Sequence, residues 1–288
     1  MAKPEIDDVT GVETTGHEWD GIKELNKPLP RWWLWVLYVS IVWAFGYWIA
    51  YPAWPLVSNY TKGVIGYSQR QTLMDSVAAA KAAQAKFRDA VAATELGEIR
   101  SKPDLLTFAL AGGKAAFGDN CAPCHGRGAQ GFKGYPNLND DSWIWGGKIT
   151  DIHQTIRYGI RSDHDDTRAN DMPKFGIDEV LDAAQINDVS EFVLSLSGTK
   201  GDHKAVGRGR AIYAEQCVAC HGEVGKGNQE LGSPNLTDAI WLYGGTKADV
   251  IESVRTGRGG VMPGWTGRLD DVTIKQLAVY VHALGGGQ

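Results

Sequence analysis

The four cysteines of the chain form two close pairs, and a histidine directly follows each pair. In each motif two residues separate the thiols, so both thiols can reach the two vinyl groups of one porphyrin while the histidine binds the iron from one face. Because the two motifs use every cysteine, they predict two covalently attached c-type haems. The attachment residues are Cys121, Cys124 and His125 in the first motif and Cys217, Cys220 and His221 in the second.

Other uses of paired cysteines explain this pattern less well. A thioredoxin-like redox pair is usually single and lies among alternating strands and helices, a context that is not evident around Cys121 or Cys217. A zinc site made of four cysteines would not explain a histidine at the same offset from both pairs. A disulfide framework is not expected to place all its cysteines in two such close pairs.

The two methionines that follow the motifs are the leading candidates for the sixth ligand of each iron. Met172 follows the first motif and Met262 the second, each precedes a proline, and each lies in a polar, loop-like stretch. A thioether ligand favours Fe(II), raises the haem potential and leaves no open position for a substrate, which suits electron transfer. We therefore expect Met172 to bind the first iron and Met262 the second, with His153 and His164 as alternative ligands of the first.

An internal repeat supports this pairing. After each haem motif the same short motifs recur in the same order: Pro-Asn-Leu, a tryptophan followed by Gly-Gly, Arg-x-Gly and Met-Pro. The copies differ in a polar insertion around residues 162–168, before the first methionine. Two copies of one fold, each with one haem, are therefore expected. The motifs begin at Pro136, Trp143, Arg157 and Met172 in the first copy and at Pro234, Trp241, Arg255 and Met262 in the second.

The flanks of each motif predict the helices of the domain. We expect helices over Leu105–Asn120 and Ala184–Leu196 in the first copy and over Val206–Gln216 and Thr273–Leu284 in the second. They resemble the crossed terminal helices of the class I cytochrome c fold, in which a glycine lets the helices approach and aromatic rings interlock. The corresponding residues are Gly113, Phe117 and Phe192 in the first copy and Gly209, Tyr213 and Tyr280 in the second.

Ahead of the repeat, Trp32–Ala50 is an uncharged run rich in tryptophan. At about 1.5 Å per residue, a helix of this length crosses a hydrocarbon core of about 30 Å. A cleaved signal peptide would begin near residue 1, whereas a mostly polar segment comes first. We therefore expect a membrane helix over residues 31–54, with small residues that are candidates for contacts with a neighbouring helix in lipid. They are Ser40, Ala44 and Gly46.

Charges and haem chemistry predict how this helix is oriented. Lys23, Lys27 and Arg31 precede it closely, and fewer basic residues follow, which favours a cytoplasmic N-terminus. Bacteria attach haem to such cysteine motifs outside the cytoplasmic membrane, so we expect both haem segments in the periplasm. Between the helix and the haems, Ser68–Thr94 is rich in alanine and predicts a long helix. The net charge of −5 excludes a basic nucleic-acid-binding protein.

The N-terminal segment carries the most specific resemblance. It begins Ile6-Asp-Asp-Val-Thr-Gly-Val-Glu-Thr-Thr-Gly-His-Glu-Trp-Asp-Gly and ends Asn-Lys-Pro-Leu-Pro-Arg-Trp-Trp33. This segment, with the membrane helix and the two haem motifs, resembles the dihaem P subunit, FixP or CcoP, of bacterial cbb3-type cytochrome oxidases. The resemblance implies an electron carrier between a cytochrome c donor and the oxygen-reducing haem–copper subunit, beside a monohaem cytochrome c subunit. It also implies that His125 and Met172 bind one haem and that His221 and Met262 bind the other.

The expected architecture is mainly α: one N-terminal transmembrane helix followed by two tandem class I cytochrome c domains in a bacterial inner-membrane protein. Three other functions remain open: the cytochrome subunit of a membrane dehydrogenase, a dihaem peroxidase and a haem gas sensor. The last two need an accessible or labile sixth iron position, which two methionine ligands would deny. The expected segments are residues 1–30 (cytoplasmic), 31–54 (membrane), 55–104 (helical linker), 105–200 (first haem domain) and 204–288 (second haem domain).

Overall fold

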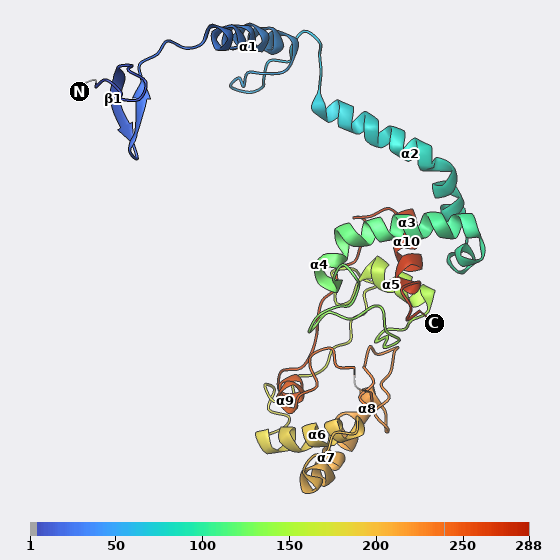
Figure 1. The fold of residues 1–288 in the computed structure, drawn as a ribbon. Helices are drawn as coiled ribbons and strands as arrows, with labels where there is room; N and C mark the ends of the chain where they lie inside the picture. Colours follow the sequence, from blue (N-terminus) through green and yellow to red (C-terminus); the bar gives the residue numbers. More distant parts are fainter. Residues whose placement is uncertain (1–4, 239, 288) are drawn as a thin grey trace. The chain divides into compact units, whose positions relative to one another are not determined.

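The computed structural model describes residues 5–238 and 240–287, and it is mainly helical, as expected (Figure 1). The first four residues of the expected 1–30 segment, and residues 239 and 288 of the second haem segment, lie outside the described residues. The elements are β1 (Thr14–Trp19), β2 (Ile22–Leu25), α1 (Arg31–Ala50), α2 (Gln69–Ala93), the 3₁₀ helix η1 (Leu96–Ser101), α3 (Pro103–Asn120), α4 (Ala122–His125), α5 (Ile149–Tyr158), α6 (Ala183–Leu196), α7 (His203–Gln216), α8 (Val218–His221), α9 (Lys247–Thr256) and α10 (Asp271–His282).

The chain divides into two compact units, one up to Ala83 and one from Gln84 onward. The first unit holds an antiparallel hairpin of β1 and β2, which the sequence analysis did not predict. Asp20 and Gly21 form its turn with φ of 50° and 83°. Positive φ at both central residues is typical of the tight turns that match the twist of a two-stranded hairpin.

The same unit contains α1, the one helix of the described residues that is long and apolar enough to cross a membrane. Its mean hydropathy is 1.6, and none of its residues is buried. A helix that is apolar on every side has no single face to bury in a soluble core, so lipid is the solvent that suits it. The apolar helix expected within residues 31–54 is present from Arg31 to Ala50, and its length and composition make it a candidate membrane span.

In the second unit, the end of the expected linker helix α2 is packed onto α10. Val91 is fully buried, and the ring of Phe87 stacks on Phe108 of α3. The ammonium of Lys275 on α10 donates to the carbonyls of Ala92 and Thr94, both at 2.9 Å. A cation at the carbonyl end of a helix satisfies acceptors that lack partners in the helix and complements its dipole. This part of the linker is thus fixed on the haem-motif unit.

The terminal helices of the two copies pair across the repeat. The structure packs α3 against α10 and α6 against α7, whereas the sequence analysis expected the first and last helices of each copy to meet (Figure 1). The four helices lie where they were expected, but each compact core combines segments of both copies. The linear boundaries 105–200 and 204–288 therefore describe the repeat in the sequence and not the composition of the two cores.

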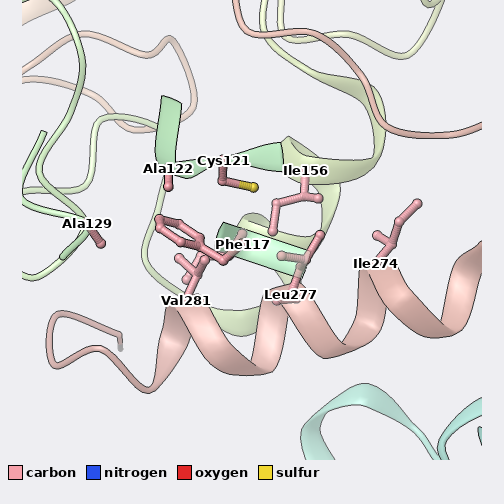
Figure 2. Close-up of a cluster of buried hydrophobic side chains, with 10 residues drawn as sticks. Phe117, Cys121, Ala122, Ala129, Ile156, Ile274, Leu277 and Val281 are labelled. Carbon is pink, nitrogen blue, oxygen red and sulfur yellow. The ribbon is translucent and has the colours of Figure 1, made fainter. Parts of the chain in front are cut away.

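The first core joins α3, α4 and α5 of the first copy to α10 of the second. Figure 2 shows Ile274, Leu277 and Val281 projecting from α10 toward Phe117 and Cys121. Ile274 and Leu277 are fully buried. Burial of each such side chain contributes about 1.5–3 kcal/mol to folding. The second core has the same plan, with α7, α8 and α9 of the second copy closed by α6 of the first.

The aromatic contacts expected from the cytochrome c resemblance occur in this exchanged form. Phe117 lies against Tyr280 with ring centroids 5.5 Å apart, and Tyr213 lies against Phe192 at 5.0 Å. A short connection explains the exchange, because only residues 197–202 separate α6 from α7. Helices that are joined by so short a link usually pack together.

Gly113 lies where α3 meets α10, and its replacement tests this contact. A Cβ at residue 113 would lie 2.3 Å from the carbonyl oxygen of Gln276, so α10 would have to move. We expect Gly113→Ala to lower the free energy of unfolding by about 1–3 kcal/mol. Gly118→Ala, in the same helix with open space around it, is the control and is expected to be neutral or stabilising. Thermal unfolding of the haem-loaded chain measures both; equal stability of the two variants would contradict the close approach.

Candidate haem-binding site

Each cysteine motif forms a short helical turn that begins where a longer helix ends. Cys121 caps the C-terminal end of α3, directly after Asn120, and its amide donates to the carbonyl oxygen of Phe117 at 2.9 Å. The amide of His125 in turn donates to the carbonyl of Cys121 at 2.9 Å. The second motif repeats both bonds with the same lengths, from Cys217 to Tyr213 and from His221 to Cys217. Each turn thus brings two free thiols and an imidazole close together.

The imidazole of each motif is oriented by a backbone carbonyl. His125 Nδ1 lies 3.1 Å from the oxygen of Pro136, and His221 Nδ1 lies 3.1 Å from that of Pro234. A carbonyl can only accept, so Nδ1 carries the proton and Nε2 keeps a free lone pair. Metal-binding histidines commonly make this second contact. Burial lowers the pKa of both histidines, with the carbonyl contact acting in the opposite direction, so the neutral, ligating form is favoured.

The first cysteine of each pair faces the apolar core. Burial raises the pKa of the Cys121 thiol to about 11, and that of Cys217 also to about 11. Cys124 is exposed, so in the first pair one thiol is buried against the core and the other faces solvent. Two free thiols beside an oriented imidazole and an apolar wall form a donor set that fits a covalently attached porphyrin.

The methionines lie in the cores opposite to those expected. Met262 packs against the first core with Cys121, and Met172 packs against the second core with Cys217. The packing therefore does not support the expected pairs His125–Met172 and His221–Met262. The reason is the helix exchange, because each methionine precedes the terminal helix that crosses to the other copy.

Backbone bridges between the copies hold both methionine loops. The amide of Met262 donates to Ile160 at 2.9 Å, and the amide of Ile160 donates back to Met262 at 2.9 Å. Met172 and Arg258 exchange the equivalent bonds, at 2.9 and 3.3 Å. Each methionine thus pairs with the residue that follows the Arg-x-Gly motif of the other copy.

The glycine of each Arg-x-Gly motif makes this pairing possible. Gly159 has φ of 77°, and a Cβ there would lie 2.4 Å from the carbonyl oxygen of Met262. Gly257 has φ of 69°, and its Cβ would lie 2.4 Å from the carbonyl oxygen of Met172. Only a residue without a side chain adopts this conformation at this distance easily. These glycines mark the repeat in the sequence, but their role beside the methionines was not predicted.

The alternative histidine ligands of the first iron lie on α5 and in the insertion at 162–168. His153 is on α5, where burial and the charges of Arg157 and Lys275 lower its pKa. His164 lies in the insertion at 162–168, with its ring 4.6 Å from that of Tyr158. Trp265 packs against the first core and follows Met262 by three positions. Phe175, which is buried in the second core, follows Met172 at the same spacing, and neither aromatic residue was predicted from the sequence.

No group of three or more histidine, cysteine, aspartate or glutamate side chains that could hold a metal ion occurs in residues 5–238 and 240–287. What these residues offer chemically is two similar sites, each with two thiols, one imidazole and one thioether.

Comparison with known proteins identifies the family. Two family profiles match: "N-terminal domain of cytochrome oxidase-cbb3, FixP" over residues 11–58, and "Cytochrome C oxidase, cbb3-type, subunit III" over residues 108–193 and 204–281. The chain belongs to the FixP/CcoP family of cbb3-type cytochrome c oxidase subunits. Family membership agrees with the resemblance drawn from the N-terminal segment, and the two matched stretches of the second profile correspond to the two copies of the repeat.

Curated members of the FixP/CcoP family match over nearly their full lengths. The FixP subunit of Azorhizobium caulinodans is 55% identical over 284 residues, which cover 98% of this chain and 96% of that protein. The CcoP subunit of Azospirillum brasilense is 52% identical over 295 residues, and the matched stretch covers the full length of both chains. The FixP subunit of Bradyrhizobium diazoefficiens is 54% identical over 286 residues, or 99% and 98% of the two chains. Cytochrome c domains imply c-type haem, and the two cysteine pairs fit two haems.

Proposed function

We propose that this chain is the two-haem electron carrier of a cbb3-type oxidase and passes electrons from a cytochrome c donor toward the oxygen-reducing haem–copper subunit. The observation that carries the proposal is the presence of two similar cores, each with a cysteine–histidine turn and a methionine packed against it. Iron that is bound on both faces has no open position for oxygen or peroxide. The chain therefore has no oxygen chemistry of its own, and its part in the oxidase is electron transfer.

The proposed ligands follow the packing in space. Cys121 and Cys124 would attach the first haem, and His125 and Met262 would bind its iron. The amide bridges at Met262 keep the thioether loop on that core.

The second haem is assigned in the same way. Cys217 and Cys220 would attach it, and His221 and Met172 would bind its iron. The haem supplies one-electron chemistry when bound, while the protein residues orient the ligands, exclude water and set the potential. Each core thus belongs to one haem and to both copies of the repeat.

The proposed placement has the N-terminus in the cytoplasm, α1 across the bacterial inner membrane and both cores in the periplasm. The uniformly apolar surface of α1 and the basic residues Lys23, Lys27 and Arg31 support this placement. The proposed partners are the haem–copper subunit, the monohaem cytochrome c subunit and a soluble or membrane-tethered cytochrome c. Ser40, Ala44 and Gly46 on α1 are the proposed helix-contact residues.

The purified, haem-loaded full chain in detergent tests this function. It is expected to bind two haems, to accept electrons rapidly from reduced cytochrome c and to consume no oxygen alone. The reduced chain is expected to bind no carbon monoxide, because a methionine occupies each sixth position. Rapid binding of carbon monoxide to the fully loaded chain would instead identify a sensor or a peroxidase.

A further inference from the structure

Arg161 lies between the two methionine loops and contacts both of them. Its Nε donates to the carbonyl oxygen of Gly260 at 2.7 Å, and one of its terminal nitrogens donates to the carbonyl oxygen of Asn170. Gly260 stands two residues before Met262, and Asn170 stands two residues before Met172. One side chain thus bonds to the same position of both loops.

The backbone around Arg161 is itself held in place. Its amide donates to the carbonyl of Arg168 at 2.7 Å, which closes the insertion, and its neighbour Ile160 pairs with Met262. Arg161 adopts φ of 50°, a left-handed conformation that is uncommon for a residue with a side chain. These contacts direct the guanidinium toward the two carbonyls from a fixed position.

The equivalent position in the other copy contributes no side chain. The Arg-x-Gly motif is followed by Ile160 and Arg161 in the first copy and by Arg258 and Gly259 in the second. A Cβ at Gly259 would lie 3.8 Å from Cδ of Arg161, so the two equivalent positions meet at the same place. The pseudosymmetric pair of haem sites therefore shares one arginine.

We propose that Arg161 is a positioning residue that holds both methionine loops at once and thereby keeps both thioethers at their irons. The proposal rests on the proposed ligation by Met172 and Met262. Arginine suits this role because its planar group carries five donors in a rigid fork and remains charged. Charge-assisted bonds to backbone carbonyls are stronger than neutral ones, so each loop loses a strong contact when the side chain is removed.

Imidazole competition on the oxidised, full-length chain measures how firmly each thioether is held. In a Met172→Ala background the opened iron saturates with imidazole first, and the later phase reports the haem that keeps its methionine. A Met262→Ala background reports the other haem. In both backgrounds Arg161→Ala is expected to lower the imidazole dissociation constant of the later phase about tenfold. The loss of one charge-assisted bond weakens the hold on the methionine loop, so imidazole displaces the thioether more easily.

Two further variants make the result specific. Arg210→Ala removes an exposed arginine of α7 and is expected to leave imidazole binding unchanged. Arg161→Lys keeps the charge but lacks the forked guanidinium that reaches both carbonyls. The imidazole affinity is therefore expected to match that of the unsubstituted residue 161 in one background at most. An Arg161→Ala effect in only one background, or in neither, would overturn the shared role. If the wild-type chain lacked the methionine-to-iron absorption band, the ligation proposal itself would fail, independently of residue 161.

Discussion

A chain that carries both His125→Ala and Met262→Ala is expected to keep about half of its methionine-to-iron charge-transfer absorbance. The physical reason is that both substitutions damage the same haem, because Met262 packs against the core that holds Cys121. Combining His125→Ala with Met172→Ala is expected to abolish the absorbance, since Met172 packs in the core of the other motif. Absorption spectra of the two oxidised double variants measure the difference directly.

The single His125→Ala variant is the matched control for both combinations, and it is expected to lose about half of the absorbance whether or not its haem stays attached. Pairing within each copy would give the reverse result, with the His125→Ala/Met172→Ala chain keeping half. The potential provides a second readout. Met262→His is expected to lower the potential of the haem on His125 by on the order of 100 mV, because the axial ligand strongly influences haem potential.

The attachment motifs and the helices that flank them could be predicted because their signals are local. The spacing of Cys121, Cys124 and His125 defines its chemistry within five residues of sequence, and the structure folds both motifs into the same turn. Helical periodicity likewise located α3, α6, α7 and α10. Gly113 was predicted to lie at a close helix contact, and it does so.

The partner of each helix could not be read from the repeat alone. Both copies contain equivalent helices, so the contact between a glycine and an aromatic residue can form within a copy or between copies with nearly the same side chains. What distinguishes the two arrangements is the length of the connection at 197–202 and pairs such as Asp188 with Arg208, which join α6 to α7. The hydrogen bonds of Arg208 lower the pKa of Asp188, so this contact favours the charged carboxylate. A charged pair between consecutive helices is a signal that the sequence contains.

The N-terminal hairpin was missed although its turn signal is present. Asp20-Gly21 is a typical two-residue hairpin turn, but the flanking strands contain few of the alternating apolar residues that usually identify strands. Trp19 and Ile22 are both exposed beside the turn. Without a buried face, the alternation that predicts a strand does not arise, and the turn alone was too weak a signal.

Dividing the chain at the connection between α6 and α7 is expected to leave neither half able to form a haem core alone. In a chain that ends at residue 200, α3 has no α10, and the side chains that fill the first core are missing. Ile274, Leu277 and Val281 alone contribute roughly 1.5–3 kcal/mol each. That sum is comparable to the total stability of a typical domain, about 5–15 kcal/mol, so the truncated chain is expected to be unfolded or aggregated.

Co-expression of the two halves, residues 1–200 and 201–288, is the matched control. Each half carries one attachment motif and the helix that closes the core of the other, so the two chains are expected to assemble one to one with a haem on each. Size-exclusion chromatography with haem absorbance, together with the methionine-to-iron band, measures the assembly. A chain of residues 1–200 that alone binds haem with histidine and methionine would show that the copies close independently. Recovery of both sites only in the co-expressed pair would establish that each haem depends on residues from both copies.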